Sequence, residues 1–347
     1  MTSPEPPRAR GEQAVAAGMG PDRSGRGGRR RGRRRDEHQM VPDAVFTSYY
    51  GRPVVKASPW AADIPAYLFL GGLAAGSSLL AAGADLTGRP GLRLAGRATA
   101  AAALTASFAA LVHDLGRPAR FVNMLRMLKV TSPMSVGTWI LSAYAPLAYT
   151  AAAQELAPVL PDRARRLAGL AGRPAGLAAA LVAPAVASYT GVLLADTATP
   201  TWNAARRHLP FLFAASAGAA ASGMGMLAAP VSEAGPARRL ALLAATADLV
   251  IARHLETTIG LPAEPLHAGR AGQLMTAARV LTAAGALGVL AARRSHAAAA
   301  VSGTALLAGS ACLRFGIFQA GQASAGDPRY TTVPQRERMR AEGRPGA

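Results

Sequence analysis

The chain has 347 residues, of which half are hydrophobic and only 16% are charged, and its formal net charge is +19. So many apolar and so few charged residues exclude an ordinary soluble domain. Much of the positive charge sits in the first 35 residues rather than on an extended surface. This distribution argues against nucleic-acid binding, which requires a basic face directed at phosphates.

The N-terminal segment 1–45 is rich in proline, glycine and arginine and has little apolar content. Such a composition cannot bury a core, so we expect a disordered basic tail. The arginine run is not interpreted as a twin-arginine export signal, because no apolar region or small-residue cleavage site directly follows it.

Apolar stretches of the length that a helix needs to cross about 30 Å of hydrocarbon recur after this tail. They predict an all-α integral membrane protein with eight transmembrane helices. An even number of crossings places both termini on one face of the membrane. The expected spans are Ile64–Leu86, Leu94–Val112, Pro133–Ala153, Pro174–Leu194, Pro210–Ala229, Leu240–Leu255, Ala271–Ala292 and Ala297–Ala320.

The loops on the terminus-bearing face carry most of the chemically distinctive residues, whereas the opposite loops, including Gln154–Arg173, hold mainly arginine, proline, glycine and alanine. One-sided enrichment predicts a site or a partner on that face, although tryptophan is also common at membrane interfaces. Counting the arginine tail, the positive-inside rule predicts cytoplasmic termini of a protein in the cell membrane. The enriched residues are His38, His113, His208, His254, His267, Trp60, Trp139 and Trp202.

Two phenols and a carboxylate are candidates for contact with a quinone ring. Asp63 and Tyr67 are four residues apart at the start of the first span, so they share one helical face. Together they could hydrogen-bond a quinone carbonyl and exchange its protons. Tyr189, late in the fourth span, is expected at a comparable depth. The alternatives are that Asp63 caps its helix and that both tyrosines are interfacial anchors.

Four further residues are candidates for a proton relay. His113 and Asp114, at the end of the second span, could pass protons between the site and water. An ion pair of Asp114 with a loop arginine, Arg117 or Arg120, is the alternative. Asp248 and Arg279 lie within spans, as does Arg314, and such charges usually face the bundle interior. Asp248 and Arg279 could form a structural pair or part of a proton path.

The single cysteine, Cys312, can form neither an internal disulfide nor an iron–sulfur cluster, which requires about four thiolates. Any such cluster must therefore belong to a partner chain. The histidines lie at the ends of spans rather than facing each other inside a bundle, so we expect no intrinsic haem and no metal site.

Four segments together resemble the NrfD/PsrC family, the membrane subunits of polysulfide, nitrite and related molybdopterin or multihaem oxidoreductases. The resemblance extends over 46–333, and leaves the tails 1–45 and 334–347 outside. The matching segments are YYGRPVVKASPW with IPAYLFLGGLAAGSS, HDLGRPARFVNMLRMLKVTSPMSVGTWIL, SYTGVLLADTATPTWN and RFGIFQAGQASAGDP.

This resemblance implies two four-helix bundles that bind menaquinol or menaquinone. It also implies a ferredoxin-like iron–sulfur subunit as partner, which would connect this chain to a catalytic molybdopterin subunit. The chain alone would then not be catalytic. Motif matching places Tyr67, Tyr189 and the neighbouring Asp63 in the quinone pocket, with Tyr67 where some members have histidine. An ion-translocating or transport module and a purely structural anchor remain the alternatives.

Overall fold

The computed structural model describes residues 52–116, 123, 125–126, 128–293 and 295–342, and within these ranges it contains helices and turns but no strand. The expected tail 1–45, with His38, and the loop residues Arg117 and Arg120 lie outside the described ranges. The long helices are α1 (Asp63–Leu86), α2 (Pro90–Leu115), α4 (Pro133–Glu155), α5 (Asp162–Ala195), α7 (Leu209–Ala228), α8 (Gly235–Thr258), α9 (Gly269–Gly288) and α10 (His296–Gly326). The short ones are α6 (Pro200–Ala204), α11 (Arg329–Ala341) and the 3₁₀ turns Ala157–Val159, Leu261–Leu266 and Ala291–Arg293.

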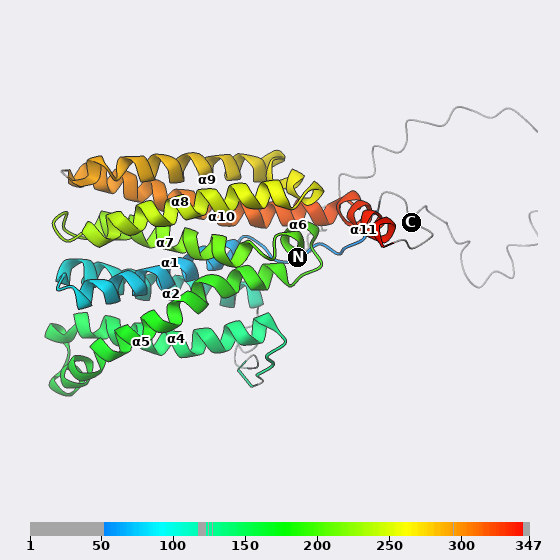
Figure 1. Cartoon of the computed structure of the whole chain (residues 1–347). Helices are drawn as coiled ribbons and strands as arrows, with labels where there is room; N and C mark the ends of the chain where they lie inside the picture. The colour runs from blue at the N-terminus through cyan, green and yellow to red at the C-terminus, as the bar shows by residue number, and fades with distance from the viewer. Residues whose placement is uncertain (1–51, 117–122, 124, 127, 294, 343–347) are drawn as a thin grey trace, which may run out of the picture. The chain divides into compact units, whose positions relative to one another are not determined.

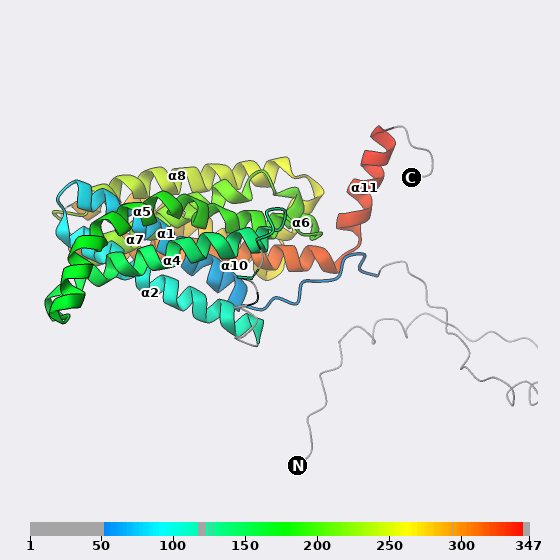
Figure 2. The ribbon, with the colours of Figure 1, turned by 90° about the horizontal axis from the view of Figure 1, so that it is seen from below.

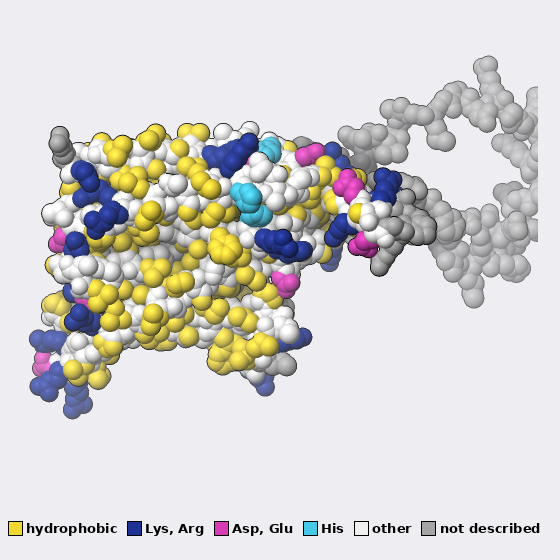
Figure 3. Space-filling model, viewed as in Figure 1, with side chains coloured by type: hydrophobic (Ala, Val, Ile, Leu, Met, Phe, Trp, Pro, Cys, Tyr) yellow, Lys and Arg dark blue, Asp and Glu magenta, His cyan; other side chains and the backbone are white. Residues whose placement is uncertain are grey.

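Five of the described helices, α1, α2, α5, α7 and α10, are long and apolar enough to cross a membrane. Hydrophobic and uncharged side chains cover the middle of the face shown in Figure 3, while many lysines and arginines gather toward the ends. Each expected span overlaps one of the long helices. The described chain is therefore that of an all-helical, multi-pass membrane protein. Helices α4, α8 and α9 are long but lack a comparably apolar stretch of membrane-spanning length.

One expected loop is largely helical. The segment Gln154–Arg173 was interpreted as a connection, but α4 continues to Glu155 and α5 begins at Asp162. The expected span begins at Pro174, because the apolar stretch begins there. Helix α5 instead accommodates Pro174 and Pro184 and begins with an acidic residue, Asp162, in its first turn. The charged first turns of α5 do not resemble a membrane span in sequence.

The long helices lie side by side, as Figures 1 and 2 show, and small residues allow close approach between them. Helix α1 packs against α2, α5 and α7. A Cβ atom added at Gly76 of α1 would lie 2.6 Å from the carbonyl oxygen of Ala217 in α7. One added at Gly96 of α2 would lie 2.9 Å from the carbonyl oxygen of Ser77. Small residues at such contacts are typical of helix packing in lipid.

A buried charge cluster ties α1, α2 and α4 together at the end opposite α11. Arg97 is 4% exposed, and its guanidinium lies 2.8 Å from Glu155 and 3.7 Å from Asp85. Arg93 contacts the same two carboxylates at 2.8 and 3.2 Å. Arg173 of α5 also lies 3.3 Å from Asp85. The loop composition gave no sign of this cluster, because its members come from four different helices.

A buried tryptophan packs between helices near the terminus-bearing face. Trp202 of α6 is fully buried, and its indole N–H donates to the carbonyl oxygen of Ile317 in α10 at 2.8 Å. Its ring stacks on Trp60, with the ring centres 6.1 Å apart. Trp202 is therefore a packing residue rather than an interfacial anchor, whereas Trp139 is 41% exposed. This contact fixes Trp60 beside the start of α1.

We expect Gly76→Ala to destabilise the protein, because the added methyl group would overlap the Ala217 carbonyl, and overpacking costs about 1–3 kcal/mol. Thermal unfolding in detergent measures this as a lower midpoint. Gly83→Ala on the same helix is the matched control, since nothing lies within 4 Å of its Cβ position. Equal midpoints for the two variants would contradict the packing described.

Candidate functional site

A cavity of about 100 Å³ lies among α1, α2, α4 and α5, toward the terminus-bearing ends of these helices. Its walls are mainly apolar, and its polar groups come from two tyrosines, a threonine and one carboxylate. Three residues named from the sequence, Tyr67, Asp114 and Tyr189, are among those that line it. The lining residues are Trp60, Ile64, Tyr67, Leu111, Asp114, Leu115, Met134, Gly137, Thr138, Leu141, Tyr189 and Leu193.

The two phenols meet in this cavity. The hydroxyl groups of Tyr67 and Tyr189 are hydrogen-bonded to each other, although the residues are 122 positions apart. Both are buried, at 4% and 8% exposure. Gly137 of α4 makes room for the Tyr189 ring, because a Cβ atom there would overlap the ring. Burial and this shared hydrogen bond do not fit the interpretation of the tyrosines as interfacial anchors.

A second group of polar residues lies beside the cavity. Asp63 Oδ2 and His113 Nδ1 are hydrogen-bonded at 3.0 Å, and the His113 side chain is 80% exposed. Asp114 is hydrogen-bonded by the backbone of Ala61 and is near enough to Asp63 to interact electrostatically. Asp63 also lies in the first turn of α1, where a carboxylate is favourable. Asp63 makes no side-chain cap hydrogen bond, and it is not among the residues that line the cavity, so its expected contact with a quinone ring stays a prediction.

The remaining two relay candidates do not join this group. Arg279 of α9 pairs with Glu256 of α8 at 3.1 Å, so the suggested pairing of Arg279 with Asp248 is wrong. The nearest interacting charge of Asp248 is Arg314, and Asp248 Oδ1 has no hydrogen-bond partner among the described residues. The sequence alone could not reveal these pairings, because the paired residues come from three different helices, α8, α9 and α10. Neither Asp248 nor Arg279 lines the cavity.

Several lining residues were missed or not assigned to the site from the sequence. Trp60 was noted only as part of the enriched face, and Met134, Gly137 and Thr138 of α4 were not singled out. The glycine in SPMSVGTWIL was the available signal, since a glycine at the start of a span often permits close approach. Its partner ring, Tyr189, could be identified only from the fold.

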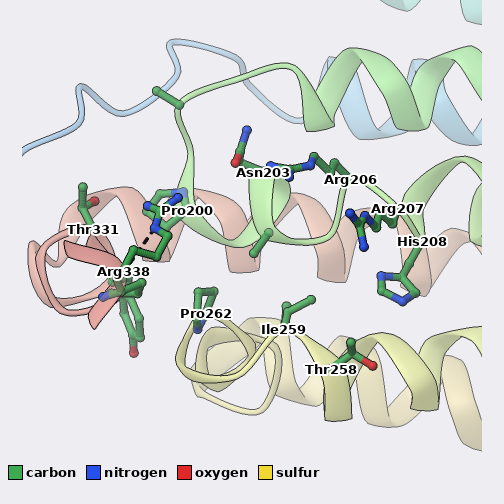
Figure 4. Close-up of a pocket in the computed structure, with 14 residues that line it drawn as sticks. Pro200, Asn203, Arg206, Arg207, His208, Thr258, Ile259, Pro262, Thr331 and Arg338 are labelled. Atoms are coloured by element: carbon green, nitrogen blue, oxygen red, sulfur yellow. Dashed lines mark hydrogen bonds between the residues drawn. The ribbon is translucent and has the colours of Figure 1, made fainter. Parts of the chain in front are cut away.

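A larger hollow of about 630 Å³ lies on the same face, between α6, α8 and α11 (Figure 4). Three arginines, Arg206, Arg207 and Arg338, line it together with His208, and none of its lining residues is acidic. Burial and the nearby positive charge of His254 and Arg207 lower the pKa of His208. The His208 and His254 rings meet edge to face, 5.1 Å between centres. The lining of this hollow is therefore cationic, while Glu264 beside it bonds the lining residue Tyr330.

The architecture and the cavity define a class, a multi-pass helical membrane protein with a small polar–aromatic cavity near one end of the helices. The family model described as polysulphide reductase, NrfD, matches residues 54–251, which is more than half of the chain. The chain belongs to this family. The match includes every helix that lines the cavity, from α1 to α5. No curated protein matches the chain.

We expect Arg279→Gln to destabilise the protein, because it removes the closest ion-pair partner of Glu256, whose side chain is only 1% exposed. The cost should be below the about 3–5 kcal/mol of breaking a fully buried pair, because Arg279 is 35% exposed and Arg253 and His267 remain 4.0 Å from Glu256. Thermal unfolding of Arg279→Gln, Glu256→Gln and the double variant measures the coupling. Arg253→Gln is the control, since Arg253 is 75% exposed and 4.0 Å from Glu256. Strictly additive effects of the two substitutions would contradict the pairing.

Proposed function

We propose that this chain is the quinone-facing membrane subunit of an oxidoreductase and binds menaquinol or menaquinone where Tyr67 and Tyr189 meet. The meeting of these phenols inside an otherwise apolar cavity is the observation that carries the proposal. Ligand pockets typically combine apolar walls with a few convergent polar groups. Membership of the NrfD family supports the same assignment.

The cavity has suitable chemistry for a quinone but not the volume for a ring when the phenols touch. At about 100 Å³ it is smaller than the roughly 300–1,000 Å³ of typical ligand pockets. A ring therefore enters only when the Tyr67–Tyr189 hydrogen bond opens, and each freed hydroxyl can then donate to a quinone oxygen. The indole of Trp60 provides an aromatic wall at the same place.

Oxidation of a quinol releases two electrons and two protons, and the described residues offer a short route for the protons. Asp114 lines the cavity, and the Asp63–His113 pair lies between it and the solvent-exposed surface. Asp114, Asp63 and His113 are thus the proposed proton acceptors. Asp248 and Arg279 lie outside the cavity, so the route does not include them.

The electrons pass, in this proposal, to an iron–sulfur subunit and from there to a catalytic, molybdopterin-type subunit. The basic hollow formed by α6, α8 and α11 is the proposed docking surface, because it is on the same face as the quinone cavity. The proposal includes eight membrane crossings in two four-helix halves. Helices α1, α2, α4 and α5 form the half that holds the cavity, and both termini are cytoplasmic.

We expect Tyr67→Phe with Tyr189→Phe to lower menaquinol oxidation by the complex purified from host membranes. A loss of at least about tenfold is expected, because positioned proton-transfer groups contribute on the order of 10²–10⁴ in rate. Tyr149→Phe is the matched control, since Tyr149 is 37% exposed and bonds Thr105 outside the cavity. Unchanged quinol oxidation in the double variant, with the complex intact, would refute the assignment of the site.

We expect Arg206→Glu with Arg207→Glu to weaken docking of the iron–sulfur subunit, since reversed charges repel an acidic surface. The measurement is the iron and acid-labile sulfide that copurify with the tagged chain from host membranes. Arg163→Glu with Arg166→Glu, at the other end of α5, makes the same change of charge away from the hollow. Equal loss of iron in both double variants would exclude this surface as the docking site.

A further inference from the structure

A third hollow, of about 760 Å³, lies between α1, α5, α7 and α8 and is distinct from the two already described. Its walls are almost wholly small or apolar, and Leu79 and Leu243 beside it are 41% and 72% exposed. Only two charged side chains line it, Arg89 and Arg239, and both are cationic. The lining residues are Gly76, Leu79, Leu80, Gly83, Thr87, Arg89, Pro184, Ala187, Ala214, Ala215, Ala217, Gly218, Pro236, Arg239, Leu240, Leu243, Ala244 and Ala247.

The two arginines lie at one end of this groove, the end opposite α11. Arg89 directly precedes α2, and Arg239 is in the first turns of α8. The apolar lining extends from them along α1 to Gly76 and along α8 to Ala247. At 1.5 Å per residue these stretches are about 12–20 Å long, close to the roughly 15 Å depth of one leaflet. The groove therefore has a cationic end at the membrane surface and an apolar end near the bilayer centre.

Neither groove arginine forms an ion pair among the described residues, because the carboxylates Asp85 and Glu155 at this end of the helices pair with other arginines. The Arg89 side chain donates to the carbonyl oxygen of Thr87, at 3.3 Å, and its backbone N–H donates to that of Ala84, at 2.9 Å. Arg238 and Arg293 add positive charge nearby: burial, together with repulsion from Arg293 and Arg239, lowers the pKa of Arg238. Figure 3 shows arginines and lysines gathered at this end of the helices. Like charges held together favour an anion among them.

We propose that this groove binds one anionic phospholipid, with its phosphate between Arg89 and Arg239 and an acyl chain along α1, α7 and α8. Charge complementarity selects an anionic headgroup, and the one-leaflet length of the apolar part selects a lipid chain. A quinone tail would need no cations at this end, and the quinone cavity lies toward the opposite ends of α1 and α5, the two helices that line both sites. The groove is thus a lipid site separate from the redox site.

The test uses the full chain in detergent, titrated with phosphatidylglycerol or phosphatidylcholine and observed by native mass spectrometry. We expect a single phosphatidylglycerol to bind at least about tenfold more tightly than phosphatidylcholine, since each surface arginine contributes a factor of about five. Arg89→Gln with Arg239→Gln should abolish this preference. Arg163→Gln with Arg166→Gln, at the same end of the helices but outside the groove, should retain it.

Ala247→Phe tests the apolar part, because the larger ring would occupy the groove and should lower binding of both lipids. Unfolding midpoints in phosphatidylcholine establish that each variant is folded. If Ala247→Phe is not folded, the proposal is tested by the Arg89→Gln, Arg239→Gln double variant alone. Three results would overturn the proposal: equal binding of the two lipids, an undiminished preference after loss of both arginines, or displacement of phosphatidylglycerol by inorganic phosphate. The last result would indicate a site for a free anion instead.

Discussion

Close approach of helix backbones is the constraint on which the rest of the structure depends. Without a hydrophobic driving force between helices in lipid, contact surfaces must fit at van der Waals distance. Gly76 against the Ala217 carbonyl and Gly96 against that of Ser77 set the positions of α7 and α2 relative to α1. Because α1 also carries Tyr67, these contacts determine where the first phenol lies. A third glycine, Gly137, admits the second phenol from α5.

The polar groups of the cavity have different degrees of contact with solvent, which suits a proton-coupled reaction. The two phenols are buried, Asp114 borders the cavity, and His113 is largely exposed. Charged groups are costly in hydrocarbon, so uncharged phenols are favoured at buried positions and ionisable side chains nearer the membrane surface. The basic hollow proposed for docking lies on the same face as the cavity.

Sequence reasoning located the long helices, because length and apolar content determine a membrane span, but only five of the described helices are long and apolar enough to cross a membrane, so eight crossings stay a prediction. It also identified five residues that the fold brings together, Asp63, Tyr67, His113, Asp114 and Tyr189. It failed for pairings between helices, because those depend on rotation about each helix axis. Arg279 was therefore assigned to Asp248 rather than Glu256, and the Arg97 cluster was missed. The first turns of α5 were missed for another reason: their charges are typical of a loop.

The ion pairs of the Arg97 cluster can form in the order in which its residues are synthesised. Arg93 and Arg97 emerge from the ribosome well before Glu155, but only shortly after Asp85. The first two helices can thus insert as a hairpin whose arginines are partly neutralised by Asp85, at 3.2 and 3.7 Å. Glu155 joins them when α4 arrives, at 2.8 Å from each guanidinium. Arg173 of α5 is made last and lies 3.3 Å from Asp85, so synthesis from the N-terminus completes the ion cluster in three steps.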